Sequence, residues 1–387
     1  MSVACLTTGG DREEWIEELR KFCVEVRTYN RPMWKDSHRL LRGTVLSPPG
    51  TASKYWHRGF GCVIREIVER RKPDIVEFHH LNTAIYRDFA GDCPSILREH
   101  NVEYKVWERC AEAAEPFFER SYLRWSAPRV RRYERKVAET FDRCVVVTPA
   151  DGAYLRAAAP RARIEVIPSG VDTEYFYPAS EIAEEPFSIT ITGSFEWKPK
   201  QQSLAVLLTE VFPRIRAKEE RAKLYVVGKG VPSDLRRVAE RTPAVWVVGA
   251  VADVRPYVWR SSLVINYLES GGGIALKVLE AMAMRKPVLT NALGCEGISV
   301  KSGQAVFVTE GFDEFASGAA QLLRDELGRR RLAENGYERV LQEYSWNAVA
   351  GQFEKVYEIL VGEKKVLGGR HKNEAPMLGG ARADAAD

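Results

Sequence analysis

The chain has 387 residues, of which 45% are hydrophobic and 28% are charged, and its formal net charge is +4. No apolar run approaches the roughly 18 residues needed to span a membrane, and no basic patch followed by an apolar core marks a secretory signal. We therefore expect a cytoplasmic protein, with the inner face of the cell membrane as an alternative location, and no nucleic-acid partner.

The seven cysteines are scattered along the chain without CxxC spacing. An odd number without such spacing suits reduced thiols better than a disulfide framework or a zinc site. We assign the cysteines no catalytic role.

Twelve short apolar runs rich in β-forming residues alternate with helical patterns from one end of the chain to the other. They occupy residues 2–8, 24–29, 74–80, 93–100, 143–149, 164–170, 187–194, 223–230, 244–250, 262–268, 286–292 and 304–310. Strand–helix alternation of this kind predicts an α/β protein whose parallel sheets have helices on both faces.

Pro and acidic residues interrupt this pattern in the segment DTEYFYPASEIAEEPF. We therefore predict a first doubly wound domain over 1–172, a linker over 173–187 and a second domain over 188–362, whose last helix returns to the first domain. The Gly- and Ala-rich residues 363–387 are predicted to be disordered. A cleft between two such domains is where open α/β folds bind ligands.

Basic residues cluster in the segment RWSAPRVRRYERKVAETFDR, from Arg124 to Arg143. Our first interpretation is a solvated helix face. The alternative is a surface for an anionic membrane or an acidic partner.

A glycine run opens the segment ESGGGIALKVLEAMAMRKPVLT, residues 269–290. A helix that starts near Gly273 would leave its first N–H groups and positive dipole end facing the glycines, which is typical of a diphosphate site. Lys277 and Glu280 could then face the same ligand, the lysine toward phosphate and the carboxylate toward a vicinal diol. The alternative is a plain loop followed by a surface ion pair, and spacing alone leaves both open.

Several segments in order resemble glycosyltransferase family 4, whose retaining enzymes have the GT-B fold of two Rossmann-like domains facing a central cleft. They are REHNVEY, VVVTPADGAYL, VIPSGVDTEYF, ITGSFEWKPK, YVVGKG, VADVRPYVWRSSLVINYL, GGGIALKVLEAMAMRKPVLTNALGCEGI and YSWNAVAGQFEKVY. The resemblance covers residues 3 to about 360. The ordered set is far more specific than any single motif and favours the diphosphate interpretation.

The resemblance implies a donor site in the second domain. The donor diphosphate would contact Gly271, Gly272, Gly273, Ile274, Ala275 and Leu276. Lys277 would stabilise the departing diphosphate, and Glu280 matches the second Glu of the family's E-x7-E pattern, which holds the ribose. The first Glu of that pattern is replaced by Gly272, which removes the usual contact with the donor sugar.

Two further segments match donor-side and acceptor-side positions of the family. Gly193 and Ser194 resemble the loop that faces the phosphates, and Lys198 or Lys200 would supply the basic partner that Ser194 cannot. His100 matches a histidine near the reacting centre.

Glu103 is expected to help position the acceptor. His79 and His80 are interpreted as structural or acceptor-side residues.

By resemblance, a sugar passes from a UDP- or GDP-activated donor to a saccharide or lipid-linked acceptor with retention of configuration. The leaving diphosphate takes the acceptor's proton. A DxD motif is absent, so we expect no metal and no other cofactor. Peripheral membrane association would suit a lipid-linked acceptor in cell-envelope or polysaccharide biosynthesis.

Three alternatives stay open. The chain could be a catalytically impaired or truncated homologue that only binds nucleotide-sugars, which Gly272, Ser194 and the short amino terminus favour. By the resemblance, either VACLTTGG serves as the family's first strand and loop or, as we favour, one strand–helix unit is absent. A nicotinamide oxidoreductase would need a GxGxxG motif, and VGKGVPS supplies only two of the glycines. A sugar-nucleotide epimerase shares the fold, but the residues it needs are not evident.

Overall fold

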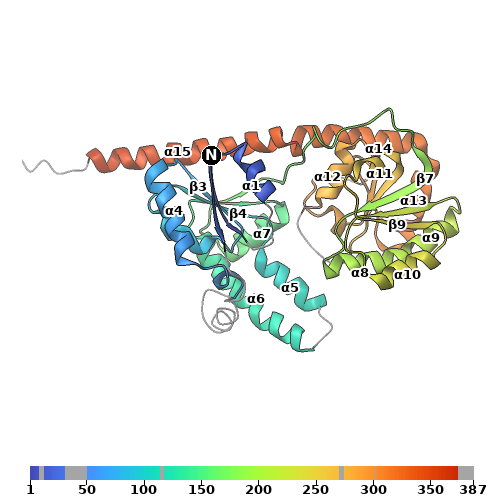
Figure 1. Cartoon of the computed structure of the whole chain (residues 1–387), viewed down its shortest axis with the longest axis horizontal. Coiled ribbons are helices and arrows are strands. Elements are labelled where there is room, and N and C mark those ends of the chain that lie inside the picture. The colour runs from blue at the N-terminus through green and yellow to red at the C-terminus, as the bar shows by residue number, and fades with distance from the viewer. Residues whose placement is uncertain (8–12, 31–49, 114–116, 270–273, 301, 374–387) are drawn as a thin grey trace, which may run out of the picture.

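The computed structural model describes residues 1–7, 13–30, 50–113, 117–269, 274–300 and 302–373. Each of the twelve predicted runs overlaps one strand. Figure 1 shows two α/β units side by side, with successive C-terminal helices running along them. The predicted α/β class is therefore confirmed.

The first unit contains six strands. They are β1 (Ser2–Thr7), β2 (Glu25–Asn30), β3 (Val76–His79), β4 (Ser95–Glu99), β5 (Arg143–Val146) and β6 (Ile164–Val166). Strands β3 to β6 form a parallel sheet in that order, and Leu97 pairs with Phe78 on one side and Cys144 on the other. Strand β5 is buried along its length, as expected for a parallel strand covered on both faces.

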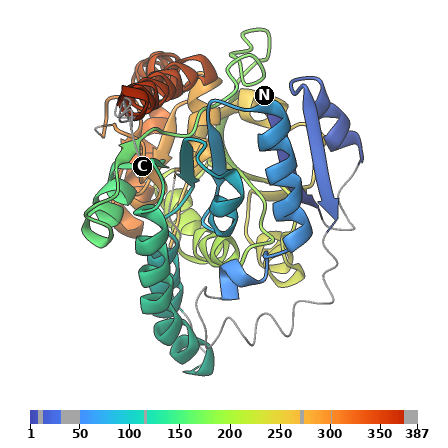
Figure 2. The same cartoon turned by 90° about the vertical axis from the view of Figure 1, so that its left-hand side faces the viewer.

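Strands β1 and β2 form a separate parallel pair. Figure 2 shows this pair beside helix α4 (Arg58–Arg71). Within the described residues, no hydrogen-bonded ladder joins it to the four-stranded sheet. The absence of a first strand–helix unit stays a prediction.

The other helices of the first unit lie between these strands. They are α1 (Glu13–Arg20), α3 (Gly50–Ser53), η2 (Ala84–Ala90), α5 (Glu103–Ala113), α6 (Phe117–Ala138) and α7 (Pro149–Ala158). Helix α7 begins where the sequence favours it, because the Thr148 hydroxyl accepts a hydrogen bond from the Asp151 N–H at 2.9 Å and Pro149 occupies the first helical turn.

The second unit contains one six-stranded parallel sheet, in the order β12-β11-β10-β7-β8-β9. The strands are β7 (Glu185–Thr192), β8 (Lys223–Val227), β9 (Val245–Gly249), β10 (Ser261–Asn266), β11 (Val288–Thr290) and β12 (Phe307–Val308). The predicted linker overlaps the first three residues of β7, because the Glu185 carboxylate is held by Lys223 at 2.7 Å and by the Tyr225 hydroxyl at 3.0 Å.

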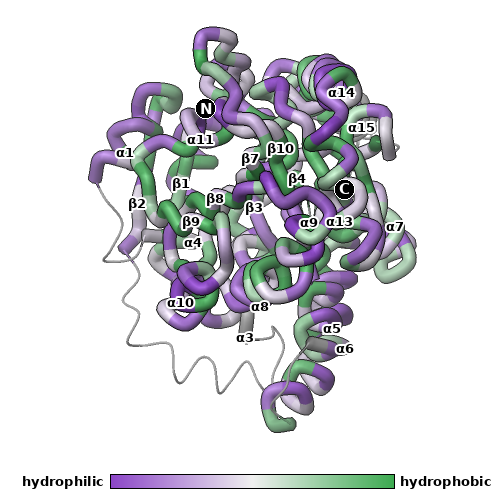
Figure 3. The backbone as a smooth tube through the Cα atoms, turned by 90° about the vertical axis from the view of Figure 1, so that its right-hand side faces the viewer, coloured by the Kyte–Doolittle hydropathy of each residue, from purple (hydrophilic) through white to green (hydrophobic). Residues whose placement is uncertain are grey.

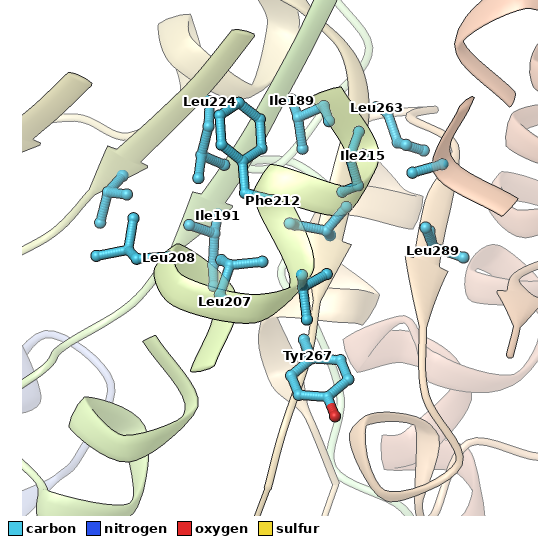
Figure 4. Close-up of a cluster of buried hydrophobic side chains, with 14 of the residues drawn as sticks. Ile189, Ile191, Leu207, Leu208, Phe212, Ile215, Leu224, Leu263, Tyr267 and Leu289 are labelled. Atoms are coloured by element: carbon cyan, nitrogen blue, oxygen red, sulfur yellow. The ribbon is translucent and has the colours of Figure 1, made fainter. Parts of the chain in front are cut away.

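Helices cover both faces of this sheet. They are α8 (Lys198–Val206), η3 (Leu207–Val211), α9 (Phe212–Lys218), α10 (Ser233–Arg241), α11 (Arg255–Arg260), α12 (Leu276–Ala283), η4 (Leu293–Cys295), α13 (Gly311–Arg324), α14 (Glu326–Arg339) and η5 (Val340–Tyr344). Figure 4 shows the core on one face, where Phe212 and Leu207 meet Ile191 and Leu224 of the strands. In Figure 3 the exposed helix α10 is coloured largely as hydrophilic.

Helix α15 (Trp346–Asn373) returns to the first unit, where Phe353 and Leu360 pack against Ile96 of β4. Helix α15 continues to Asn373 and so includes residues 363–373 of the predicted tail. The disorder of the tail stays a prediction. The Glu363 carboxylate of α15 binds Arg143 at 2.7 Å and Arg163 at 2.9 Å, which holds the helix on the first unit. Residues 374–387 lie outside the described chain.

Candidate active site

The predicted donor side of the site rests on two loops that are joined by main-chain hydrogen bonds at the carboxyl ends of β7 and β8. The Gly193 N–H donates to the Val227 carbonyl at 3.1 Å, and the Phe195 N–H donates to the Lys229 carbonyl at 2.8 Å. A Cβ at Gly228 would lie 1.7 Å from the Gly193 carbonyl oxygen, so only glycine permits this approach. The lock fixes Gly193 at the edge of the cleft.

Helix α12 supplies the anion-attracting end of the site. Its apolar face buries Val278, Leu279 and Met282 against the sheet, which directs its amino terminus toward the first unit. No side chain caps this end, and Ala275 stands at the N-cap position. The free N–H groups and the dipole of the helix therefore favour a negative ligand here.

Charged side chains reinforce this end of the helix. Burial, and then the like charge of Lys200, lower the pKa of Lys277 to about 8, while burial raises the pKa of Glu280. Lys277 is therefore mostly cationic at neutral pH but poorly solvated, and it would gain most from an anionic partner.

The floor of the site is held by the side-chain amide of Asn291, just after β11. Its oxygen accepts hydrogen bonds from the N–H groups of Leu268 at 3.2 Å and Gly294 at 3.1 Å, and its nitrogen donates to the Leu268 carbonyl at 2.7 Å. These bonds join the ends of β10 and β11 and place Leu268 under the ligand space.

These elements enclose a cleft of about 590 Å³ between the two units. Its lining residues come from both units and are Asn101, Val106, Arg109, Cys110, Thr192, Gly193, Trp197, Pro199, Lys200, Val254, Leu268, Ile274, Ala275, Leu276, Lys277 and Glu280. The lining combines apolar groups such as Trp197 and Val254 with the cations Lys277, Lys200 and Arg109. An amphiphilic ligand that has a flat ring and a diphosphate matches this combination.

One ion pair crosses between the units beside the cleft. The guanidinium of Arg109, on α5, donates to the two carboxylate oxygens of Glu296 at 2.8 and 3.0 Å. This bidentate pair is partly buried, and the Glu296 carboxylate raises the pKa of Arg109. The relative position of the two units is thus tied to a residue that lines the site.

The predicted donor residues that the structure describes largely come together. Gly193, Ile274, Ala275, Leu276, Lys277 and Glu280 all line the cleft. Gly271, Gly272 and Gly273 lie outside the described residues. The roles of all these residues stay predictions.

Two predicted donor residues lie elsewhere. The hydroxyl of Ser194 donates to the Glu196 carboxylate at 3.0 Å instead of lining the cleft. Lys198 is exposed at the first position of α8, and Lys200 lines the cleft in its place. Of the two lysines considered, the geometry therefore favours Lys200, which lies on the cleft side of the helix.

His100 and Glu103 also lie next to the lining and not in it. The imidazole of His100 approaches His79 at 3.5 Å, and its ring centroid is 4.4 Å from that of His80. Burial, and then the neighbouring His80, lower the pKa of His100 to about 4, so this ring is neutral at physiological pH.

Buried carboxyl groups lie beneath the loop that carries His100. The Glu134 carboxylate accepts hydrogen bonds from the N–H groups of Glu103 at 2.7 Å and Tyr104 at 3.1 Å, at the start of α5. Burial, and then the charge of Glu134, raise the pKa of Glu99. The bonds of Glu134 fix the start of α5, directly after His100 and Asn101.

Sequence reasoning missed Asn101, Arg109, Trp197 and Val254 as lining residues. Trp197 and Val254 lie inside segments that carry the family resemblance, ITGSFEWKPK and VADVRPYVWRSSLVINYL, and an exposed Trp beside a phosphate-loop motif was a usable signal. Arg109 carried no comparable signal, because its place depends on the docking of the two units.

Among the described residues, no three His, Cys, Asp or Glu side chains are arranged to hold a metal ion. The expectation that no metal is required stays a prediction. No described helix has the length and apolar character to cross a membrane.

Solved structures share the fold across nearly the whole chain. Sucrose-phosphate synthase from Thermosynechococcus elongatus superposes with a TM-score of 0.65 at 18% identity, covering 94% of this chain and 99% of its own. Anabaena Alr3699/HepE in complex with UDP and glucose superposes with a TM-score of 0.66 at 14% identity, covering 92% of this chain and 91% of its own. At these identities the likeness establishes the fold, which is GT-B.

Curated relatives match over part of their length. The gpi3 subunit of phosphatidylinositol N-acetylglucosaminyltransferase from Schizosaccharomyces pombe is 27% identical over 230 residues, covering 58% of this chain and 49% of that protein. D-inositol 3-phosphate glycosyltransferase from Corynebacterium urealyticum is 25% identical over 257 residues, covering 60% of each. The aligned part thus spans about half to three fifths of these relatives.

Family models match both units. The model described as Glycosyltransferase Family 4 matches residues 7–175, and the model described as Glycosyl transferases group 1 matches residues 186–325. Together they cover most of the chain and meet at the predicted linker. The protein belongs to glycosyltransferase family 4, the glycosyl transferases group 1.

Proposed function

We propose that the protein transfers a sugar from a UDP- or GDP-activated donor to a saccharide or lipid-linked acceptor. The observation that carries this proposal is the cleft in which Lys277, Lys200 and Glu280 gather at the start of α12, opposite Arg109 of the first unit. Two cations and a helix amino terminus suit a diphosphate, and Glu280 suits the hydroxyls of a ribose.

The proposed chemistry requires no protein nucleophile. The acceptor oxygen bonds to the anomeric carbon as the bond from that carbon to the diphosphate oxygen breaks, and the acceptor's proton passes to the leaving diphosphate on the same face. Configuration is then retained. The protein contributes position and charge, and Lys277 stabilises the negative charge that develops on the leaving group.

Relatives support the acceptor class. The names of several relatives include inositol. One of them is phosphatidyl-myo-inositol mannosyltransferase from Mycobacterium leprae, which is 27% identical over 198 residues that cover 50% of this chain and 52% of that protein. A hydroxylated ring, free or on a lipid, is therefore the acceptor class to screen first. The acceptor would enter from the side of α5, which supplies Val106, Arg109 and Cys110 to the cleft.

The first test is calorimetric and thermal-shift titration of UDP and GDP into the full chain and its Lys277→Ala and Glu280→Ala variants. We expect saturable binding of one nucleotide, weakened about tenfold or more in each variant, because each loses a charged contact. Lys218→Ala, at an exposed lysine of α9, is the matched control and should bind as the parent does. A folded protein that binds neither nucleotide would overturn the proposal.

A second candidate function is donor binding without transfer. It is favoured by Gly272 in place of the family's Glu and by the Ser194 hydroxyl, which faces Glu196 instead of a ligand. Nucleotide binding with neither transfer nor hydrolysis of the matching nucleotide-sugar, across a panel of hydroxylated acceptors, would establish this function instead.

A further inference from the structure

Helices α5 and α6 form a hairpin that projects from the body of the first unit. Figures 1, 2 and 3 show the pair extending past the neighbouring elements, with the start of α6 at its far end. The base of the hairpin belongs to the site, because Val106, Arg109 and Cys110 of α5 line the cleft. A surface at its far end would therefore be linked to the cleft by a single helix.

Aromatic side chains are exposed along the first two turns of α6. Phe117 and Phe118 are 74% and 86% exposed, and Tyr122 and Trp125 are 43% and 50% exposed. Such a concentration of exposed large rings at the end of a projecting element is unusual on a surface that faces only water.

Basic side chains continue the same line along the helix. Phe118, Tyr122, Trp125, Arg129, Arg132 and Lys136 follow one another at spacings of three or four residues, which places them on one face. We name these six residues the α6 stripe. Arg129 lies over the Trp125 ring at 4.4 Å, which joins the aromatic part of the stripe to its basic part.

The charge of α6 is strongly one-sided. Residues 117–138 contain seven Arg or Lys and two Glu, and one of the two is the buried Glu134. Within the described chain, Arg124, Arg132 and Lys136 form no ion pair. The uncompensated positive charge favours an anionic partner. The aromatic rings beside it favour a partner that also has an apolar region.

We propose that the α6 stripe, together with the adjacent Phe117, docks the enzyme on an anionic lipid bilayer, with Phe117 and Phe118 inserted at the headgroup level and the arginines on the lipid phosphates. Aromatic rings beside basic residues are the combination that interfacial helices use. Docking would bring the cleft close to the bilayer surface. The biological role of this docking rests on the proposed function, with a lipid-linked acceptor. For the basic segment from Arg124 to Arg143, we therefore favour the membrane surface over the solvated helix face.

The test is flotation of the full chain with vesicles of phosphatidylcholine alone or with 30% phosphatidylglycerol (about the anionic fraction that attracts basic surfaces), without donor or acceptor. We expect binding to the anionic vesicles only, reduced by 0.5 M NaCl (a Debye length of about 4 Å). Phe117→Ser with Phe118→Ser, and separately Arg132→Glu with Lys136→Glu, should each lower the bound fraction about fivefold or more.

The matched control carries Leu327→Ser and Arg331→Glu, an exposed apolar and an exposed basic residue of α14 in the second unit, and should bind as the parent does. Equal binding to both vesicle types, or unchanged binding of the α6 variants, would overturn the proposal. A dimer seen by light scattering and lost in the aromatic variant would assign the surface to self-association instead. The affinity of the α6 variants for UDP and GDP should equal that of the parent. A loss of membrane docking is thereby distinguished from a loss of donor binding.

Discussion

The two sides of the cleft are built differently. On the donor side, Lys277 and Glu280 lie three residues apart on one helix, and the loop that carries Gly193 is locked by main-chain hydrogen bonds. On the predicted acceptor side, His100 and Arg109 depend on side-chain contacts with distant segments. The predicted donor side is therefore formed by residues that are close in sequence, at the edge of a rigid sheet. The predicted acceptor side depends on distant segments, so changes in those segments can alter it without altering the donor side.

The largest effect should follow from breaking the donor-side lock. Gly228→Ala would place a methyl group 1.7 Å from the Gly193 carbonyl oxygen at a φ of +146°, so we expect a loss of about 3 kcal/mol or more in the free energy of unfolding. Gly351→Ala in α15 meets nothing within 4 Å and should be neutral or stabilising by about 0.5 kcal/mol. Urea denaturation of both variants checks this, and equal stabilities would show that the loops are not locked.

The charge of the donor side should make nucleotide binding depend on pH. Because the pKa of Lys277 is lowered to about 8 in the free protein, the lysine loses its proton above that pH, and a bound diphosphate must restore it. The affinity for the preferred nucleotide should therefore fall by up to about tenfold per pH unit above pH 8.

Calorimetry in buffers of different ionisation enthalpy should show proton uptake on binding in this range. Lys277→Arg keeps its charge at these pH values and should remove the decline. A nucleotide affinity that stays constant to pH 9.5 (about 1.5 units above the pKa of Lys277 in the unliganded protein) would mean that Lys277 does not contact the diphosphate.

The buried carboxyl pair should make stability on the acceptor side depend on pH. Burial raises the pKa of Glu134 above its ordinary value of 4.5, so the native state retains a proton that the unfolded state releases. The free energy of unfolding should fall as pH rises from 4.5 through the native pKa, by at most about 1.4 kcal/mol per unit for one proton. Glu134→Gln should flatten this dependence in denaturant titrations at several pH values, and an unchanged slope would assign the proton elsewhere.

The smallest effect should come from the ion pair between the units. Glu296→Gln keeps the size of the side chain but removes the charge opposite Arg109, so we expect a more open average arrangement and a change of about two- to fivefold in KM for the acceptor. Small-angle scattering with steady-state kinetics would detect both. Glu326→Gln on α14, also in an ion pair but far from the cleft, is the control. A change in the donor KM alone would indicate that the pair belongs to the donor side.

The sequence predicted the fold well because its evidence is local. Strands such as β5 and β10 contain short apolar cores, CVV and LVI, and Thr148 followed by Pro149 marks the start of α7. The start of the tail shows what local evidence misses. Composition past residue 363 favours disorder, whereas the contacts of Glu363 with Arg143 and Arg163 depend on residues that lie some 200 positions earlier.

The sequence by itself determined the two α/β units and the place of Lys277 and Glu280 on one side of a helix, because helix periodicity places residues three apart on one face. Only the tertiary structure decided that Lys200 and not Lys198 faces the cleft, that Arg109 meets Glu296, that His79, His80 and His100 lie together and that the α6 stripe projects from the body. Such arrangements depend on how distant elements pack, and the one-dimensional order of residues does not encode that packing locally.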